Sequence, residues 1–184
     1  MLSEFLSRKY THLFSVLDTD QSGELEEEDF TEFADNVARV RRMSTDSDAY
    51  MVVRASAARR WHMIQDTADL NSDGKVVLEE FLVAMEEMRA RALREDSLTD
   101  AVREWAVLID LFDVQQRGEI DLNGYREGLQ IFGLDGMVDA EATFEVLDVD
   151  SDGVIGEEQA LKLMAEFFFG DDPSDPGNSL LGEF

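Results

Sequence analysis

Residues 69–80 of the chain read DLNSDGKVVLEE, with Asp first, Gly sixth and an aliphatic residue eighth. The same pattern returns without gaps in three further segments: DTDQSGELEEED at 18–29, DVQQRGEIDLNG at 113–124 and DVDSDGVIGEEQ at 148–159. Each segment is acidic and twelve residues long. Four copies of one pattern in register predict a structural unit that the chain uses four times.

The residue types within each repeat are those that a hard divalent cation needs. Calcium takes roughly six to eight oxygen ligands, and a loop can supply them from side chains at positions 1, 3, 5 and 12, a carbonyl at 7 and often a water at 9. Position 6 needs a backbone turn that Gly adopts at little cost. The aliphatic eighth residue suits a short strand, so two loops can pair back to back. The repeats therefore match the EF-hand calcium loop, and we number them loops 1 to 4 in chain order.

Apolar residues at helical spacing flank the repeats. Tyr10, Leu13 and Phe14 precede loop 1, and Trp105 and Leu108 precede loop 3. Spacings of three and four residues predict a helix before and after each loop. We therefore predict an all-α fold of four EF-hands in two paired lobes, packed into a compact globule, with short β-pairing between the loops of each lobe.

Loop 2 meets every requirement for calcium. Its predicted ligands are Asp69, Asn71, Asp73, the carbonyl of Lys75, and Glu80. The Glu at position 12 can bind through both oxygens. Because Lys75 contributes only its carbonyl, we expect its charge to be no obstacle.

Loop 1 ends in Asp where loop 2 has Glu. Its predicted ligands are Asp18, Asp20, Ser22, the carbonyl of Glu24, and Asp29, with Glu26 at position 9. Since Asp is one methylene shorter than Glu, we expect Asp29 to coordinate through one oxygen or to draw the loop inward. Six-coordination is then favoured, so this site should be the one most open to competition from Mg²⁺.

Loop 4 ends in a neutral side chain. Its predicted ligands are Asp148, Asp150, Asp152, the carbonyl of Val154, and Gln159. Gln159 brings one oxygen and no charge, so charge and ligand count both fall. We expect calcium to bind here with lowered affinity.

Loop 3 is damaged at three ligand positions. It has Gln115 at position 3, Arg117 at position 5 and Gly124 at position 12. A guanidinium beside the cation, with no closing carboxylate, should leave the loop empty, so we expect two or three calcium ions in all. Its predicted role is structural, with Ile120 pairing with Ile155 to hold loop 4 in shape.

The spacing between loops divides the chain into parts. The longest interval, between loops 1 and 2, must contain extra helix. A polar break lies at Arg94 to Ser97. We predict a first lobe at 1–94 with loops 1 and 2, a second lobe at 95–170 with loops 3 and 4, and a C-terminal tail at 171–184.

The tail combines helix breakers with apolar residues. Pro173 and Pro176 prevent the preceding helix from continuing. Leu180, Leu181 and Phe184 are nevertheless apolar. We expect the tail to fold back between the lobes and cover the surface that a calcium sensor would open, with a frayed terminus as the alternative.

The charge and composition of the chain limit the classes of partner and metal site that it can have. The chain has 16 Lys and Arg against 42 Asp and Glu, a formal net charge of −26, so nucleic acid is not expected. It has no Cys, which excludes thiolate metal sites and disulfides. No apolar run approaches the ~18 residues of a membrane span, and no GxSxG, P-loop or dinucleotide motif is present. We expect a monomeric, cytoplasmic protein that is not an enzyme.

Arginines cluster in the middle of the chain, from Arg39 to Arg103. Solvated faces, or ion pairs with the acidic second half, explain them most simply. A docking site for an acidic partner is the alternative.

The enlarged first lobe, the Asp-closed loop 1 and the ending FFFGDDPSDPGNSLLG at 167–182 resemble the sarcoplasmic calcium-binding protein family. The resemblance is closest to its actinobacterial members of the calerythrin type, and it implies a bacterial protein whose lobes pack face to face. Calerythrin-type members lack a functional second loop, whereas here loop 3 is the damaged one. The ligands are therefore taken from this sequence alone.

Three functions fit a protein of this kind. The first is an intracellular calcium buffer acting through loops 1, 2 and 4, and the second is a sensor that exposes an apolar groove to a protein partner. The third is a relative of photoproteins and luciferin-binding proteins. His12 and His62 are the only histidines, which disfavours this third reading because such cavities group His, Trp and Tyr.

Overall fold

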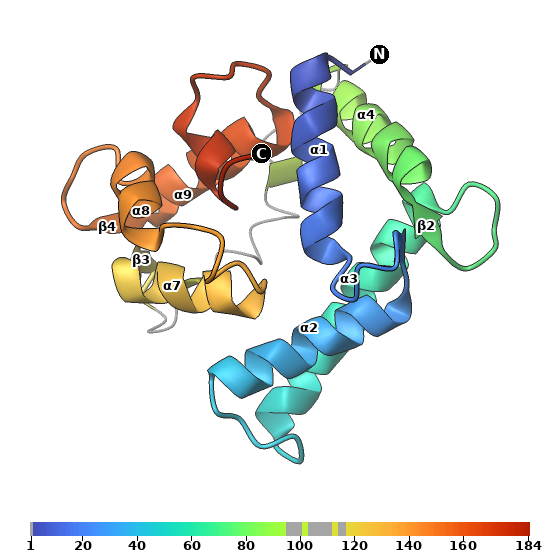
Figure 1. The fold of residues 1–184 in the computed structure, drawn as a ribbon, viewed down its shortest axis with the longest axis horizontal. Coiled ribbons are helices and arrows are strands. Elements are labelled where there is room, and N and C mark those ends of the chain that lie inside the picture. Colours follow the sequence, from blue (N-terminus) through green and yellow to red (C-terminus); the bar gives the residue numbers. More distant parts are fainter. Residues whose placement is uncertain (1, 95–100, 103–111, 114–116) are drawn as a thin grey trace.

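The computed structural model describes residues 2–94, 101–102, 112–113 and 117–184 (Figure 1). Helices dominate these residues, and two small antiparallel sheets join them. The predicted all-α fold of paired EF-hands is therefore confirmed. The predictions for Trp105, Leu108 and Gln115, and for the break at 95–97, lie outside the described residues.

Loops 1 and 2 are each bracketed by helices, as the apolar spacing predicts. Ser3 caps the first helix, accepting a 3.0 Å hydrogen bond from the backbone N–H of Leu6. The elements in chain order are α1 (Glu4–Leu17), β1 (Glu24–Leu25), α2 (Glu27–Val40), α3 (Asp48–Ala68), β2 (Val76–Val77) and α4 (Leu78–Arg94). Strand β1 pairs antiparallel with β2, so that Leu25 lies opposite Val76.

Loops 3 and 4 form the second pair. The described elements are β3 (Glu119–Asp121), α7 (Leu122–Ile131), α8 (Ala140–Leu147), β4 (Val154–Gly156), α9 (Glu157–Phe169) and a short 3-10 helix, η2 (Pro176–Ser179). Strands β3 and β4 pair antiparallel with Ile120 opposite Ile155. The predicted pairing of these two side chains is confirmed.

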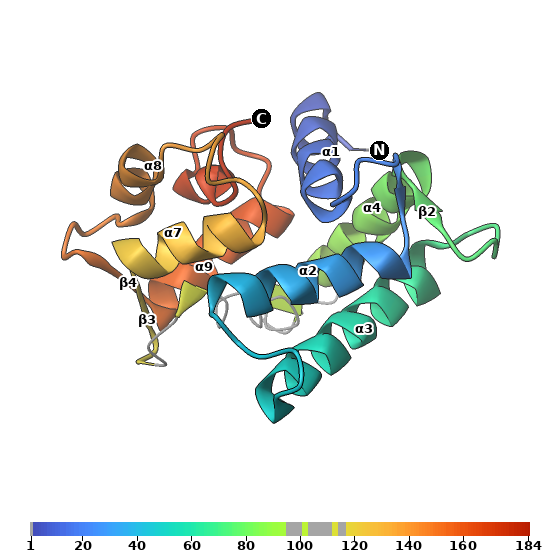
Figure 2. The ribbon, with the colours of Figure 1, turned by 60° about the horizontal axis from the view of Figure 1, so that its bottom comes forward.

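The two loop pairs face each other across a shared core. Figure 2 shows α2 beside α7, and the rings of Phe33 and Phe132 join them at a centroid distance of 5.3 Å. Helix α1 stands between α4 and the C-terminal segment (Figure 1). Buried aromatic side chains from both loop pairs, among them Tyr10, Trp61, Tyr125 and Phe168, belong to this core.

Candidate metal centres

The loops share one backbone path. At position 4 the backbone is left-handed in loops 1, 2 and 4, and at position 6 a Gly has φ between 74° and 91° in all four. The position 4 residues are Gln21, Ser72 and Ser151, and the glycines are Gly23, Gly74, Gly118 and Gly153. A side chain at position 6 would be strained by this φ, which explains why Gly recurs there.

The Asp at position 1 organises loops 1, 2 and 3 from within. In loop 1, Asp18 accepts hydrogen bonds of 2.9 Å from the N–H groups of Ser22 and Gly23, one on each carboxylate oxygen. The position 1 residues of loops 2 and 3, Asp69 and Asp113, accept the same pair of bonds. This carboxylate therefore folds the loop around the place where a cation would sit.

Loop 1 gathers three carboxylates. One oxygen each from Asp18, Asp20 and Asp29 lies within 4.8 Å of the others. Asp29 is 3% exposed, and burial raises the pKa of its carboxyl. Three like charges at this distance repel one another, so the geometry fits a divalent cation.

Hydrogen bonds fix the position 12 carboxylate of loop 1. Oδ1 of Asp29 accepts from the N–H of Thr19 at 2.9 Å and from its hydroxyl at 3.0 Å. Oδ2 accepts from the N–H of Glu26 at 2.8 Å. The short Asp side chain is thus anchored to both ends of its own loop, which leaves it little freedom to reach outward.

Loop 4 also gathers three carboxylates, from Asp148, Asp150 and Asp152, within 4.8 Å. Oδ1 of Asp148 is buried and has no hydrogen-bond partner among the described residues. A buried carboxylate oxygen without a partner is costly, and a cation would supply that partner. Loop 4 therefore fits calcium even though Gln159 closes it.

Loop 2 brings its predicted ligands together less tightly. Its carboxylates, Asp69, Asp73 and Glu80, do not form a group within 4.8 Å in the described part of the chain. Glu80 instead accepts a 3.2 Å hydrogen bond from the N–H of Val77. The side chain of Asn71 likewise accepts a 2.8 Å hydrogen bond from the N–H of Asp73. Both predicted ligands are thus hydrogen-bonded to the backbone of their own loop.

Loop 3 carries its own cation. The guanidinium of Arg117 pairs with Glu119 at 3.3 Å and with Asp121 at 3.5 Å. A Cβ atom at Gly124 would lie 2.2 Å from the backbone oxygen of Phe112, so a closing carboxylate cannot stand at position 12 without moving the backbone. The predicted absence of calcium from loop 3 has these physical reasons and stays a prediction.

The side chain of Lys75 has a role that the sequence reasoning missed. Its Nζ lies 2.5 Å from Oε1 of Glu26 in loop 1, and it also pairs with Glu24 of the same loop. Hydrogen bonds to these carboxylates raise the pKa of the Lys75 ammonium group. The signal was available, because pairing Leu25 with Val76 places Glu26 opposite Lys75.

Comparisons with known proteins agree with this geometry. A family model described as an EF-hand domain pair matches residues 3–36, and one described as an EF hand matches residues 140–158. Sarcoplasmic calcium-binding proteins I, III and IV of Branchiostoma lanceolatum are 26% identical over 99% of this chain and 98% of their own.

Two solved structures are similar in fold. The calcium-loaded apo form of the coelenterazine-binding protein from Renilla muelleri matches with a TM-score of 0.77 and 21% identity, over all of both chains. A Streptomyces coelicolor calcium-binding protein, described with prokaryotic calcium-mediated regulation, matches with a TM-score of 0.68 and 22% identity over 91% of this chain and 99% of its own.

These loops, helices and relatives define a calcium-binding EF-hand protein. Within that class the chain is similar over nearly its whole length to the sarcoplasmic calcium-binding proteins. The closer likeness to calerythrin-type members and the lobe boundaries at 94 and 170 stay predictions. No helix among the described residues has the length and apolar character of a membrane span.

Proposed function

We propose that this protein is an intracellular calcium buffer that binds ions in loops 1, 2 and 4 and leaves loop 3 empty. In this proposal it acts as a monomer and catalyses no reaction. The observation that carries it is the C-terminal tail, which covers the apolar surface of the second loop pair. A sensor must expose such a surface when calcium binds.

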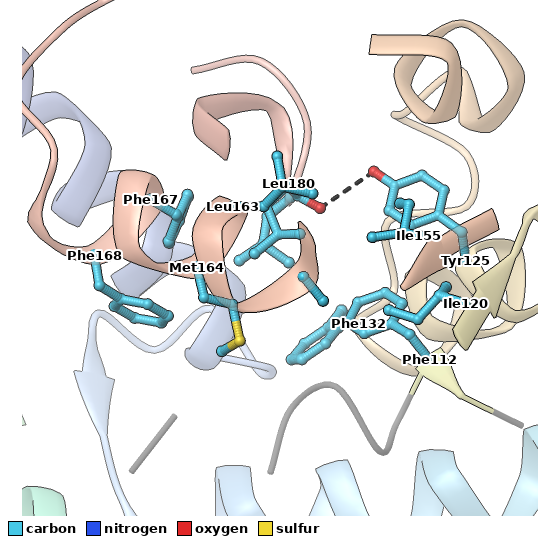
Figure 3. A pocket seen from close by; sticks show the side chains of 12 residues that line it. Phe112, Ile120, Tyr125, Phe132, Ile155, Leu163, Met164, Phe167, Phe168 and Leu180 are labelled. Carbon is cyan, nitrogen blue, oxygen red and sulfur yellow. Dashed lines mark hydrogen bonds between the residues drawn. The ribbon is translucent and has the colours of Figure 1, made fainter. Parts of the chain in front are cut away.

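The tail packs against α8 and α9 and reaches α7 at Leu180. Leu180 and Leu181 line a wholly apolar cavity together with Tyr125, Leu163 and Met164 (Figure 3). The hydroxyl of Tyr125 donates a 3.1 Å hydrogen bond to the carbonyl of Leu180. The cavity that remains has a volume of about 30 Å³, which is room for about two waters. The surface under the tail is therefore already occupied.

A buried lysine holds the tail in place. Lys9 of α1 is 0% exposed, and its Nζ donates hydrogen bonds of 3.0, 2.7 and 2.9 Å to Glu166 O, Gly170 O and Asn178 Oδ1. The hydroxyl of Tyr10 donates a further 2.6 Å bond to the carbonyl of Phe168. These bonds join α1, the end of α9 and the tail, so undocking the tail would leave several buried polar groups unpaired.

The last residues of the tail are also held. The carbonyl of Leu181 lies 2.9 Å from Nε2 of His12, and Arg8 donates a 2.6 Å bond to the backbone oxygen of Phe184. The Phe184 ring stacks on the His12 imidazole at a centroid distance of 5.7 Å. The tail therefore contacts α1 along its length up to the final residue.

A calcium titration by calorimetry, run beside binding of a hydrophobic dye, tests the proposal. We expect three ions to bind while the dye signal stays flat or falls. Deleting residues 171–184 is the matched control, and it should raise dye binding because the cavity of the second loop pair is uncovered. Dye binding that rises strongly with calcium in the full chain would overturn the buffer.

One observation favours a sensor as the second candidate. A groove of about 880 Å³ lies between α3 and α4, and Met63, Met85 and Met88 are among its lining residues. Flexible methionines are common on surfaces that accept varied partners. A calcium-dependent rise in dye binding that persists in Lys9→Met would assign the response to this groove instead of the tail.

A further inference from the structure

We propose that Lys75, a residue of loop 2, sets the calcium affinity of loop 1 by competing with the ion for Glu26. The inference rests on the proposed function, in which loop 1 binds calcium. It concerns a side chain that supplies no ligand to loop 1 and belongs to a different repeat.

The contact follows from the register of the first sheet. Glu24 lies opposite Val77 and Leu25 opposite Val76, and continuing this register by one residue beyond the strands brings Glu26 next to Lys75. Residues opposite each other on antiparallel strands have neighbouring side chains. The Nζ of Lys75 accordingly lies 2.5 Å from Glu26 and contacts Glu24 as well.

Glu26 stands at the position from which an EF-hand loop contacts its ion, often through a water. A carboxylate cannot give its full charge to calcium while an ammonium group holds it. The ammonium charge also repels an approaching divalent cation from a short distance. Both effects lower the affinity of loop 1.

Loop 1 is more sensitive to this competition than loops 2 and 4. Its closing residue, Asp29, is anchored to Thr19 and to the N–H of Glu26. Beyond the gathered Asp18, Asp20 and Asp29, the acid that position 9 adds to the site is Glu26. Loops 2 and 4 have Val77 and Gly156 at this position, so no acid there is available for capture.

Lys75 also links the two loops. Its carbonyl is the predicted position 7 ligand of loop 2, so an ion in loop 2 fixes the backbone from which the side chain reaches Glu26. We therefore expect loop 2 to fill before loop 1 in the wild type. Removing the ammonium group should reduce the difference in calcium affinity between the two loops.

The test follows the backbone amide signals of Gly23 and Gly74 by NMR during a calcium titration. Lys75→Met keeps the aliphatic stem and removes the charge, and Lys75→Arg keeps the charge. Lys162→Met is the matched control, because it removes one lysine that pairs with Glu166 at 3.6 Å, far from loop 1 in the sequence. Lys75 is 45% exposed, so these substitutions leave the core intact.

We expect Lys75→Met to raise the loop 1 affinity, read at Gly23, by roughly 3- to 10-fold at low salt, and by less at high salt. Lys75→Arg and Lys162→Met should stay within about twofold of the wild type. In Glu26→Gln, where the captured carboxylate is gone, Lys75→Met should raise the affinity by a smaller factor.

An unchanged or lowered loop 1 affinity in Lys75→Met overturns the proposal, as does an equal gain in Lys162→Met. If the Gly23 signal gives the same calcium affinity in the wild type and in the variants, only this inference fails. If Gly23 does not respond in the wild type at all, loop 1 binds no calcium, and both this inference and the proposed function fail.

Discussion

Loops 1 and 3 carry acidic residues at the same two positions, and in each loop a single basic side chain pairs with both. Positions 7 and 9 are Glu24 and Glu26 in loop 1, and Glu119 and Asp121 in loop 3. In loop 1 the cation is Lys75, which comes from the paired loop. In loop 3 it is an arginine of the loop itself, at a position that should hold a ligand.

The difference shows that the origin of a charge matters as much as its presence. A lysine from the neighbouring loop pairs with Glu24 and Glu26 and leaves Asp18, Asp20 and Asp29 gathered in loop 1. An arginine inside loop 3 replaces one of the ligands. The first arrangement tunes a site, whereas the second supplies a permanent substitute for the ion.

The largest expected effect distinguishes loop 4, which we expect to bind calcium, from loop 3, in which Arg117 takes the place of the ion. Asp148→Asn removes the position 1 carboxylate of loop 4 and should weaken calcium binding there on the order of 100-fold, because ligand charge sets affinity. The matched change Asp113→Asn in loop 3 should leave the number of bound ions unchanged. Calorimetric stoichiometry reads both, and a lost ion in Asp113→Asn would contradict the comparison.

A second substitution tests how much the contacts of Lys9 with the tail contribute to the stability of the protein. Lys9→Met leaves Glu166 O, Gly170 O and Asn178 Oδ1 without their donor, and should lower the free energy of unfolding by about 2–4 kcal/mol. Lys162→Met, at an exposed lysine, should cost less than about 0.5 kcal/mol. Urea unfolding measures both, and equal effects in the two variants would mean that the tail is not held by Lys9.

The same lysine predicts a dependence on pH. Burial lowers the pKa of Lys9 from 10.5 to about 8, although the carboxylates of Asp175, Asp171 and Glu166 act in the opposite direction. Between these values the unfolded chain binds the proton that the folded chain has lost. The free energy of unfolding should therefore rise from about pH 8 to about pH 10.5 relative to Lys9→Met. A falling difference would contradict the burial of this charge.

A smaller effect is expected at Gly124, where it tests whether loop 3 has room for a side chain at position 12. Gly124→Ala places a Cβ 2.2 Å from the backbone oxygen of Phe112 and should cost about 1–3 kcal/mol of stability. Gly136→Ala is the matched control, because a Cβ there meets nothing within 4 Å. Thermal or urea unfolding compares the two, and a tolerated Gly124→Ala would mean that loop 3 has room for a ligand.

The smallest effect concerns ion selectivity in loop 1. Asp29→Glu restores the longer closing side chain and should reduce competition by Mg²⁺ by roughly a few fold, since Mg²⁺ demands a tight six-ligand site. A calcium titration with and without magnesium, read at Gly23, gives the ratio. Unchanged competition would show that Asp29 does not set the coordination number.

Much of this architecture could be predicted from local sequence. The positions of the loops, their glycines and the pairing of Ile120 with Ile155 follow from a repeat of fixed length, so each copy supports the others. The damage to loop 3 was also visible, because Arg117 and Gly124 stand at ligand positions. The reason that Gly124 cannot be replaced was not visible, since it depends on Phe112 packing against it.

The features that were missed depend on residues far apart in the chain. Lys9 lies on a helix whose pattern marks it as polar, yet its acceptors are more than 150 residues away and the tail buries it. The sequence of loop 2 predicts only that Lys75 supplies its carbonyl, because the contact of its side chain with Glu26 depends on the loop that pairs with loop 2. For Asp29 the sequence predicts coordination through one oxygen or a loop drawn inward, whereas its anchoring to Thr19 is seen only in the folded loop.

Whether loops 1, 2 and 4 bind calcium while the tail stays docked can be tested in one NMR titration with calcium. The titration follows the amide signals of Gly23, Gly74, Gly118 and Gly153 together with those of the tail. We expect the amide signals of the glycines in loops 1, 2 and 4 to shift and saturate, while those of Gly118, Gly177 and Leu181 keep their positions. A saturating shift at Gly118, or movement of the tail as the ions bind, would contradict this expectation.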